Sequence, residues 1–208
     1  SYPTAGTLAV KDGGSVPAIQ SNTMELTIEV KETATIEKID MTIPGQTSRP
    51  MTVYITGGGT LNIPSGYISA DNGLRILDET TVNVTAKNHG MKGKGLVDIE
   101  KGTITVKATS GDGIKSDEYA VNGNDTVIVE GKGIVSITGG TIDITAGDDG
   151  IQAENFIRVS DSTETSTVKI TSTGKGFSAE KYVYVDGGTI DVTSDDDAIH
   201  THYQVFTN

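Results

Sequence analysis

The sequence of 208 residues contains no cysteine and no tryptophan. Without cysteine the chain forms no disulfides, offers no thiol nucleophile and builds no Cys-ligated zinc or iron site. The absence of tryptophan excludes a Trp-lined platform of the kind found in cellulose-binding modules. Stability and function must therefore come from packing, hydrogen bonds, other side chains or bound ions.

Basic residues are also scarce, since 16 Lys and Arg stand against 28 Asp and Glu, giving a formal net charge of −12. A nucleic-acid partner is not expected, because phosphate backbones are bound by clustered Lys and Arg. No stretch approaches the ~20 apolar residues of a membrane helix, so membrane insertion is not expected either. The first residues, SYPTAGTLAV, lack the pattern of a secretion signal. We expect a soluble domain that, if exported, is already trimmed.

Glycine, in contrast, is abundant, with 26 of the 208 residues. Hydrophobic residues make up 35% of the chain, which is enough for a lean core. No window has apolar residues sustained at the helical spacing i, i+3, i+4 and i+7, whereas short alternating runs rich in Thr, Val and Ile are common. The composition therefore predicts an all-β protein made of many short strands.

The chain repeats a short pattern of threonine followed by alternating apolar residues, as in TVNV, TITV, TIDI, TVKI and TIDV. Most repeats begin about 22 residues apart, and intervals of 38 and 26 residues contain extra residues. A unit of this size cannot bury its own apolar face, so it must stack on its neighbours. The repeats begin at Thr60, Thr81, Thr103, Thr141, Thr167 and Thr189.

Each repeat contains three short segments in which apolar and polar residues alternate. Ile142 and Ile144 belong to the first segment of one repeat, and Ile151 and Ala153 belong to its second. Stacking such units at the ~4.8 Å strand spacing predicts a single-stranded parallel β-helix with about 22 residues per coil. An antiparallel sandwich with glycine-rich turns is the alternative, but it would not repeat one turn at this spacing.

A glycine recurs at the same turn, at Gly113, Gly150 and Gly176, where a left-handed or crowded backbone favours a residue without Cβ. Ala198 departs from this pattern in the last repeat. The stretch Tyr119 to Gly131 and the run SDSTETS read as loops projecting from the stack.

We divide the chain into residues 1–59 and residues 60–208, within one continuous structural domain. All five prolines precede residue 65, and the repeat fades in the first segment. Solenoids need covered ends, so residues 1–59 are predicted to form an N-terminal cap or irregular early coils. Residues 60–208 are predicted to form the carbohydrate-binding β-helix, for the reasons given below.

Stacking places side chains that are one repeat apart within about 5 Å of each other. At the turn before the recurring glycine, the column contains Asp112, Asp149 and Asp197, with His89 and Lys175 in the other repeats. Carboxylates this close repel one another unless a cation lies between them, and calcium suits such oxygen ligands. Ordinary solvated turn acids are the alternative. The acids beside this column are Asp148, Asp195 and Asp196.

A second outward column reads Lys94, Asp117, Glu154, Glu180 and His202. Ligand sets must cross coils, because acids in one extended coil are too far apart to share an ion. Asp112 with Asp148 and Asp149, or Asp117 with Glu154, would be such sets.

A polar strip between the two columns reads Lys92, Lys115, Gln152, Ser178 and His200. Such a strip suits an extended polymer, and its lysines, or calcium, would meet the carboxylates of an acidic sugar. Lysines beside acids can equally serve only to balance charge. Aromatic candidates for stacking on sugar rings are Tyr119, Tyr182, Tyr184 and Tyr203. The predicted sugar-binding residues are Lys92, Lys94, Lys115, Gln152, Arg158, Tyr182 and His200.

An enzyme is the main rival to a binding protein. No GxSxG elbow is present, so a serine hydrolase of that type is not indicated. Calcium-assisted β-elimination of an acidic polysaccharide would need a base, for which Lys115 is the candidate. His200 and His202, close to Asp195 to Asp197, make a zinc site conceivable, although exposed strand histidines more often have no ligand.

The segments GDGIKSDE, GKGIVSITGGTIDITAGDDGIQAE and DGGTIDVTSDDDAIH resemble a bacterial family of carbohydrate-binding β-helix proteins, formerly a domain of unknown function, found mainly in clostridia and related bacteria. The resemblance covers roughly Asp71 to His202, and it includes the long insertion after GDGIKS. It implies a right-handed β-helix of the pectate-lyase type that is extracellular or attached to the cell surface. It also implies binding of calcium at the Asp-rich turns and of cellulose or acidic sugars such as pectic polymers.

Carried over by position, the implied calcium ligands are Asp112, Asp148, Asp149, Asp196 and Asp197, with Asp117 and Glu154 less firmly placed. His89 and Lys175 replace aspartate, so those coils are expected to hold no ion, and Lys175 is a candidate internal counter-charge. The resulting hypothesis is a calcium-stabilised extracellular protein that binds acidic polysaccharides of the polygalacturonate type, cellulose, or both. A calcium-dependent lyase using Lys115 and a structural adhesin stalk are the alternatives.

Overall fold

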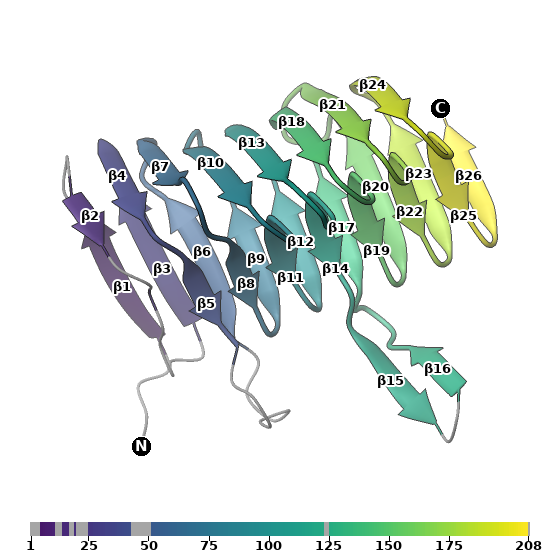
Figure 1. The fold of residues 1–208 in the computed structure, drawn as a ribbon, viewed down its shortest axis with the longest axis horizontal. Coiled ribbons are helices and arrows are strands. Elements are labelled where there is room, and N and C mark those ends of the chain that lie inside the picture. The colour runs from purple at the N-terminus through teal and green to yellow at the C-terminus, as the bar shows by residue number, and fades with distance from the viewer. Residues whose placement is uncertain are drawn as a thin grey trace.

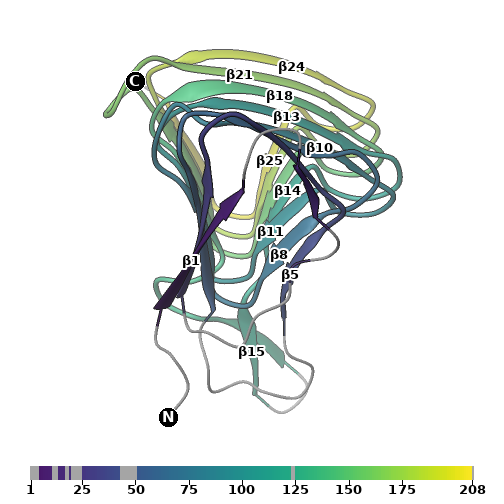
Figure 2. The same cartoon turned by 90° about the vertical axis from the view of Figure 1, so that its left-hand side faces the viewer.

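The computed structural model describes residues 5–10, 14–16, 19, 25–42, 51–122 and 125–207. In these residues the chain winds through three parallel sheets, called sheets A, B and C, and each full coil contributes one strand to each sheet (Figures 1 and 2). This confirms the predicted all-β parallel β-helix. The described part contains no helix that is long and apolar enough to span a membrane.

The strands of each sheet follow one another along the stack in chain order. Sheet A contains β1 (Ala5–Val10), β3 (Glu25–Val30), β6 (Thr52–Thr56), β9 (Gly73–Ile76), β12 (Leu96–Ile99), β17 (Ile134–Ile137), β20 (Phe156–Ser160), β23 (Tyr182–Asp186) and β26 (Gln204–Thr207). Sheet B contains β2 (Gly14–Val16), β4 (Thr33–Ile36), β7 (Thr60–Ile63), β10 (Thr81–Ala86), β13 (Thr103–Ala108), β18 (Gly140–Ala146), β21 (Ser166–Ser172) and β24 (Thr189–Ser194). Sheet C contains β5 (Ile39–Met41), β8 (Ile68–Ala70), β11 (Met91–Gly93), β14 (Ile114–Ser116), β19 (Ile151–Ala153), β22 (Phe177–Ala179) and β25 (Ile199–Thr201).

Strand pairing confirms the predicted repeat. Thr81 pairs with Thr60 and with Thr103, Thr103 pairs with Thr141, and Thr141 pairs with Thr167. The two longer intervals are accommodated outside the sheets, where inserted residues follow β14 and β20. Because the insertions lie at corners of the coil, the register inside each sheet is preserved.

The insertion after β14 is an antiparallel hairpin of β15 (Tyr119–Asn122) and β16 (Asp125–Ile128), which projects from the stack (Figure 1). The sequence predicted a projecting loop here, so the position is right but the strands were missed. The second predicted loop corresponds to residues 161–165, between β20 and β21.

The described parts of residues 1–59 belong to the same three sheets as the rest of the chain. β1, β3 and β6 pair in sequence in sheet A, and β4 pairs with β7 across the boundary at residue 60. The strand order therefore continues without a break through this boundary. The repeat is weak in this segment because its described strands carry different residues at the same positions of the sheets.

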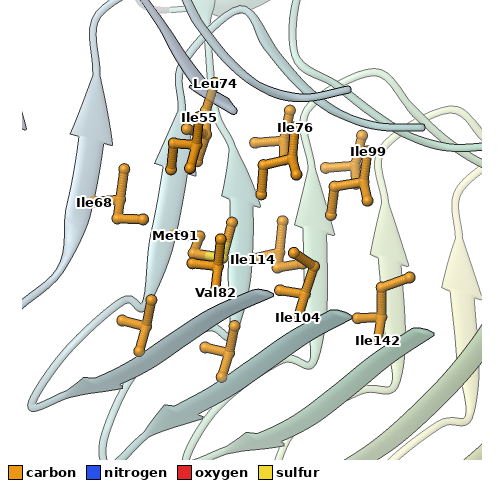
Figure 3. Close-up of a cluster of buried hydrophobic side chains, with 14 of the residues drawn as sticks. Ile55, Ile68, Leu74, Ile76, Val82, Met91, Ile99, Ile104, Ile114 and Ile142 are labelled. Atoms are coloured by element: carbon orange, nitrogen blue, oxygen red, sulfur yellow. The ribbon is translucent and has the colours of Figure 1, made fainter. Parts of the chain in front are cut away.

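Inward-facing side chains form ladders along the stack (Figure 3). Val82, Ile104, Ile142 and Val168 occupy successive coils of sheet B, and each is at most 1% exposed. Burying one such side chain contributes about 1.5–3 kcal/mol relative to leaving it exposed. The alternation read from the sequence therefore builds a continuous core between the three sheets.

Crowding, not a left-handed backbone, explains the glycine that recurs at one turn. Gly113, Gly150 and Gly176 all have negative φ. A Cβ on Gly150 would lie 2.3 Å from Cγ2 of Ile170 and 2.7 Å from the carbonyl oxygen of Gly176, both in the next coil. Ala198 occupies this turn in the last coil of the described residues, where no further coil approaches it. The one departure from the glycine pattern therefore has a steric reason.

Candidate functional site

Polar columns lie side by side on the outer surface of sheet C, called the sheet C face. Lys115 pairs with Lys92 on one side and with Gln152 on the other, and the register continues through Ser178 to His200. In β11, β14, β19 and β22 a residue of intermediate exposure lies between two buried ones, so these middle side chains point outward. The predicted adjacency of residues one repeat apart is therefore confirmed.

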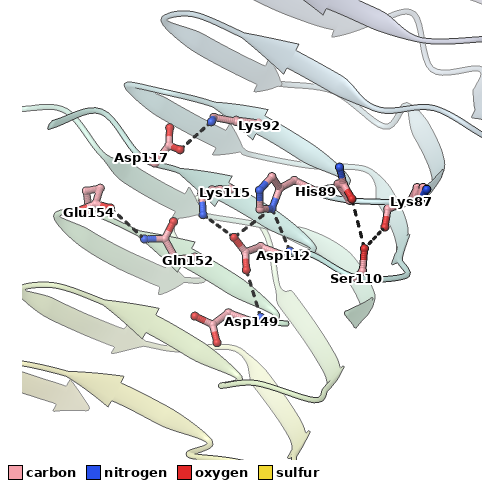
Figure 4. Close-up of polar contacts among 11 residues, drawn as sticks. Lys87, His89, Lys92, Ser110, Asp112, Lys115, Asp117, Asp149, Gln152 and Glu154 are labelled. Atoms are coloured by element: carbon pink, nitrogen blue, oxygen red, sulfur yellow. Dashed lines mark hydrogen bonds and ion pairs between the residues drawn. The ribbon is translucent and has the colours of Figure 1, made fainter. Parts of the chain in front are cut away.

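Asp112 is the most buried carboxylate at this surface, with a side chain only 3% exposed. Its Oδ2 accepts a hydrogen bond from Nζ of Lys115 at 2.7 Å and lies 3.2 Å from Nδ1 of His89, while its Oδ1 accepts the backbone N–H of Asp149 at 3.2 Å (Figure 4). Burial raises the pKa of Asp112, but the hydrogen bonds of His89 and Lys115 outweigh it, so the pKa falls below its usual value. Asp112 therefore connects the turns of three successive coils.

All three lysines predicted to bind sugar form ion pairs within the chain. Nζ of Lys92 lies 2.7 Å from Oδ2 of Asp117, and Nζ of Lys94 lies 3.1 Å from Oδ1 of Asp71. Lys115 is paired with the buried carboxylate described above. The ammonium groups of all three lysines therefore already contact a carboxylate of the protein itself.

The acids beside Asp112 crowd one another but do not form a complete set of metal ligands. Burial raises the pKa of Asp148, and the negative charges of Asp112 and Asp149 raise it further. Oδ1 of Asp149 accepts the backbone N–H of Lys175 at 2.7 Å. Among the residues that the structure describes, no group of three His, Asp or Glu side chains is arranged to hold a metal ion.

The aspartates of the last turn, Asp195, Asp196 and Asp197, are exposed. Oδ2 of Asp196 lies 3.4 Å from Nζ of Lys175, as expected for an internal counter-charge, and Oδ2 of Asp197 lies 3.1 Å from Nδ1 of His200. Two of the three carboxylates thus have a basic neighbour. Asp112 uses both its oxygens on protein donors, so a calcium ion at these turns would rely on the more exposed acids.

The second predicted column also brings acids together. Burial raises the pKa of Glu154, and the charges of Glu180 and Asp117 raise it further, although a hydrogen bond from Gln152 opposes this. That hydrogen bond joins Nε2 of Gln152 to Oε1 of Glu154 at 3.4 Å. The three carboxylates belong to successive coils, so their mutual repulsion is a direct consequence of stacking.

An aromatic cluster lies on the outer surface of sheet A, on and next to β20, β23 and β26. The rings of Tyr184 and Phe206 are stacked, with centroids 4.9 Å apart and an interplanar angle of 7°. The rings of Phe156 and Tyr184 pack edge-to-face with centroids 5.8 Å apart. The ring centroid of Tyr182 lies within 6 Å of those of Tyr184, Tyr203 and Phe206. Tyr203 is 66% exposed and Phe206 is 42% exposed, so the cluster faces solvent.

An open pocket of about 330 Å³ adjoins the aromatic cluster. Arg158 and Asp186 lie at this pocket, with Nη2 of the arginine 3.9 Å from Oδ2 of the aspartate. The sequence prediction included Tyr182 and Arg158 but missed Phe156 and Phe206. Their signal is present in the sequence, because the alternating segments FIRVS, YVYVD and QVFT fall in register. The pocket is lined by Phe156, Arg158, Tyr184, Val185, Asp186 and Phe206.

A family described as carbohydrate-binding domain-containing protein matches residues 7–208, which is almost the whole chain. The chain belongs to this carbohydrate-binding family. The match confirms the resemblance inferred from the sequence motifs. No curated protein and no solved structure shows a significant match to it.

The carbohydrate-binding protein therefore has two different candidate surfaces. The sheet C face is charged, and its lysines are already paired with carboxylates. The aromatic cluster is largely apolar, partly exposed and next to a pocket. Ligand sites commonly combine an apolar lining with a few polar groups, so the aromatic cluster has the composition expected of a sugar contact.

Proposed function

We propose that this protein binds polysaccharide outside the cell and that the aromatic cluster is its principal sugar contact. The observation that carries the proposal is the cluster of half-buried and exposed rings beside the pocket with Arg158 and Asp186. Aromatic rings pack against the apolar C–H faces of sugars, while charged groups at the rim accept and donate hydrogen bonds to hydroxyls. Polymers of this kind are too large to enter a bacterial cell, which supports a location outside the cell or on its surface.

A neutral polymer such as cellulose suits this surface better than a bare polyanion. The net charge of −12 opposes the approach of an acidic chain. The lysines that would attract its carboxylates are held by Asp71, Asp112 and Asp117. A neutral chain that stacks on aromatic rings avoids both obstacles.

Calcium-mediated binding of acidic sugars is the second candidate. It is supported by the crowding of carboxylates at Asp148 and Glu154, whose raised pKa values reflect burial and neighbouring negative charge. A calcium ion would relieve this repulsion, supply charge that a uronic acid can meet, and be held by the exposed acids of these turns. Calcium would then stabilise the fold as well as bridge polymer to protein.

The test is a binding isotherm on insoluble cellulose and on polygalacturonate, each with calcium and with EDTA. A variant carrying Tyr184→Ala and Phe206→Ala is expected to bind at least tenfold more weakly, which corresponds to about 1.4 kcal/mol. Tyr54→Ala is the matched control, because Tyr54 also lies in sheet A but many coils away. Unchanged affinity in the double variant, with its melting temperature retained, would overturn the assignment of the aromatic cluster.

The same experiment separates the two polymer classes and the stalk alternative. Binding to cellulose that is insensitive to EDTA indicates direct stacking, whereas binding to polygalacturonate only with calcium indicates bridging. A structural stalk would bind neither polymer.

A further inference from the structure

Two histidines lie next to each other at the last strand of sheet C. His200 lies in β25, and His202 follows at the next alternate position. Their ring centroids are 5.5 Å apart, and the ring planes meet at 80°. The two side chains are 37% and 61% exposed, so water and ions reach both rings.

A carboxylate orients each imidazole ring. Nδ1 of His200 lies 3.1 Å from Oδ2 of Asp197, and Nδ1 of His202 lies 2.7 Å from Oε2 of Glu180. An ionised carboxylate only accepts hydrogen bonds, so Nδ1 carries the proton in both rings. In the neutral rings the free lone pair is therefore on Nε2.

This arrangement is the one that metal-binding histidines use, because their second ring nitrogen usually donates to a carboxylate that fixes the ring and increases its basicity. The spacing of the rings also fits. A metal ~2.1 Å from Nε2 lies about 3.2 Å from the ring centroid, so a tetrahedral angle separates two centroids by about 5.2 Å. The observed separation of 5.5 Å is close to this value.

We propose that His200 and His202 form a two-nitrogen site for a borderline divalent metal such as Zn²⁺, Cu²⁺ or Ni²⁺, with Asp197 and Glu180 as positioning residues. Imidazole nitrogens suit these metals, whereas calcium prefers oxygen ligands. Since no three His, Asp or Glu side chains converge within the described ranges, the protein supplies two ligands and water completes the coordination. The two histidines are not part of the aromatic cluster. Asp197, which orients His200, is also one of the predicted calcium ligands.

The test is calorimetric titration of Zn²⁺ into the full chain after removal of EDTA, in excess calcium and at a slightly alkaline pH, because protons compete with metal ions for ligand nitrogens. One zinc ion per chain is expected. His200→Asn and His202→Asn should each weaken binding by at least about tenfold. His89→Asn is the matched control and should leave binding unchanged, because His89 lies at Asp112, several coils away.

The roles of Asp197 and Glu180 are tested by separate variants. Asp197→Ala and Glu180→Ala should weaken zinc binding roughly 10–100-fold, whereas Asp191→Ala, which removes an exposed charge from sheet B, should not. Electron paramagnetic resonance of bound Cu²⁺ should show two equivalent nitrogen ligands, and these should be lost in the double histidine variant. Absence of zinc binding in the parent chain, or unchanged binding in the double variant, would overturn the proposal.

Discussion

The recurring turn glycine gives the sharpest test of the stacking geometry. In Gly150→Ala, the new methyl group would lie 2.3 Å from Cγ2 of Ile170, well inside the ~3.5–4.0 Å of a normal contact. It would also lie 2.7 Å from the Gly176 carbonyl oxygen, which accepts a hydrogen bond from the backbone N–H of Ile151 at 2.9 Å. Relief of the clash therefore requires movement of a ladder hydrogen bond as well as of a side chain.

Overpacking of this kind destabilises a core by about 1–3 kcal/mol, and the reduced entropy of the unfolded chain offsets about 0.4–1 kcal/mol of it. The net loss of about 1.3 kcal/mol corresponds to a melting temperature lowered by roughly 3–5 °C for a chain of this size. Thermal unfolding followed by circular dichroism measures the shift.

The matched control is Ala198→Gly at the same turn of the last coil. Ala198 is exposed and meets no following coil in the described residues, so its free energy of unfolding should change by less than about 1 kcal/mol. A melting temperature for Gly150→Ala within one degree of the parent, or an equal loss in Ala198→Gly, would refute the steric argument.

The remaining predictions concern charge, bound ions and catalysis. Asp112→Asn should lower the free energy of unfolding by about 2–3 kcal/mol at neutral pH in chemical denaturation, because it weakens the bond from Lys115 to a buried carboxylate. The lowered pKa of Asp112 means that its stabilisation is present above the ordinary Asp value and is lost as the pH falls below it, so acid unfolding of the parent should begin there. The effect of pH through Glu154 has the opposite sign. Because its pKa is raised in the folded protein, the fold is more stable below the ordinary Glu pKa and loses stability as the pH rises through the folded-state pKa. Glu154→Gln should therefore flatten this part of the plot of stability against pH. EDTA should lower the melting temperature and calcium should restore it, and no shift in either direction counts against ion sites at the turns. Incubation of polygalacturonate with calcium and the protein should release no unsaturated products, and release that disappears in Lys115→Ala would favour the lyase instead.

Much of the fold could be predicted from the repeat. Thr81, Thr103 and Thr141 pair with one another in neighbouring coils, because residues one repeat apart in a solenoid become neighbours in the sheet. The hairpin β15–β16 could not be predicted, because its residues follow no repeat and their pairing depends on the two strands meeting outside the stack. The continuation of the three sheets through the described strands before residue 60 could not be predicted for a related reason. The described strands there pair in the same sheets but carry different residues.

The candidate site was also predictable only in part. The polar strip that contains Lys115, Gln152 and His200 could be predicted from the sequence period alone, because strand spacing and alternation determine where these residues lie. The interaction partner of each side chain could be identified only in the tertiary structure. Lys115 forms an ion pair with Asp112, and this pairing depends on burial and local distance, which the sequence period does not specify. The aromatic cluster likewise exists only because Tyr184 and Phe206, 22 residues apart, are stacked by coils whose register the core enforces.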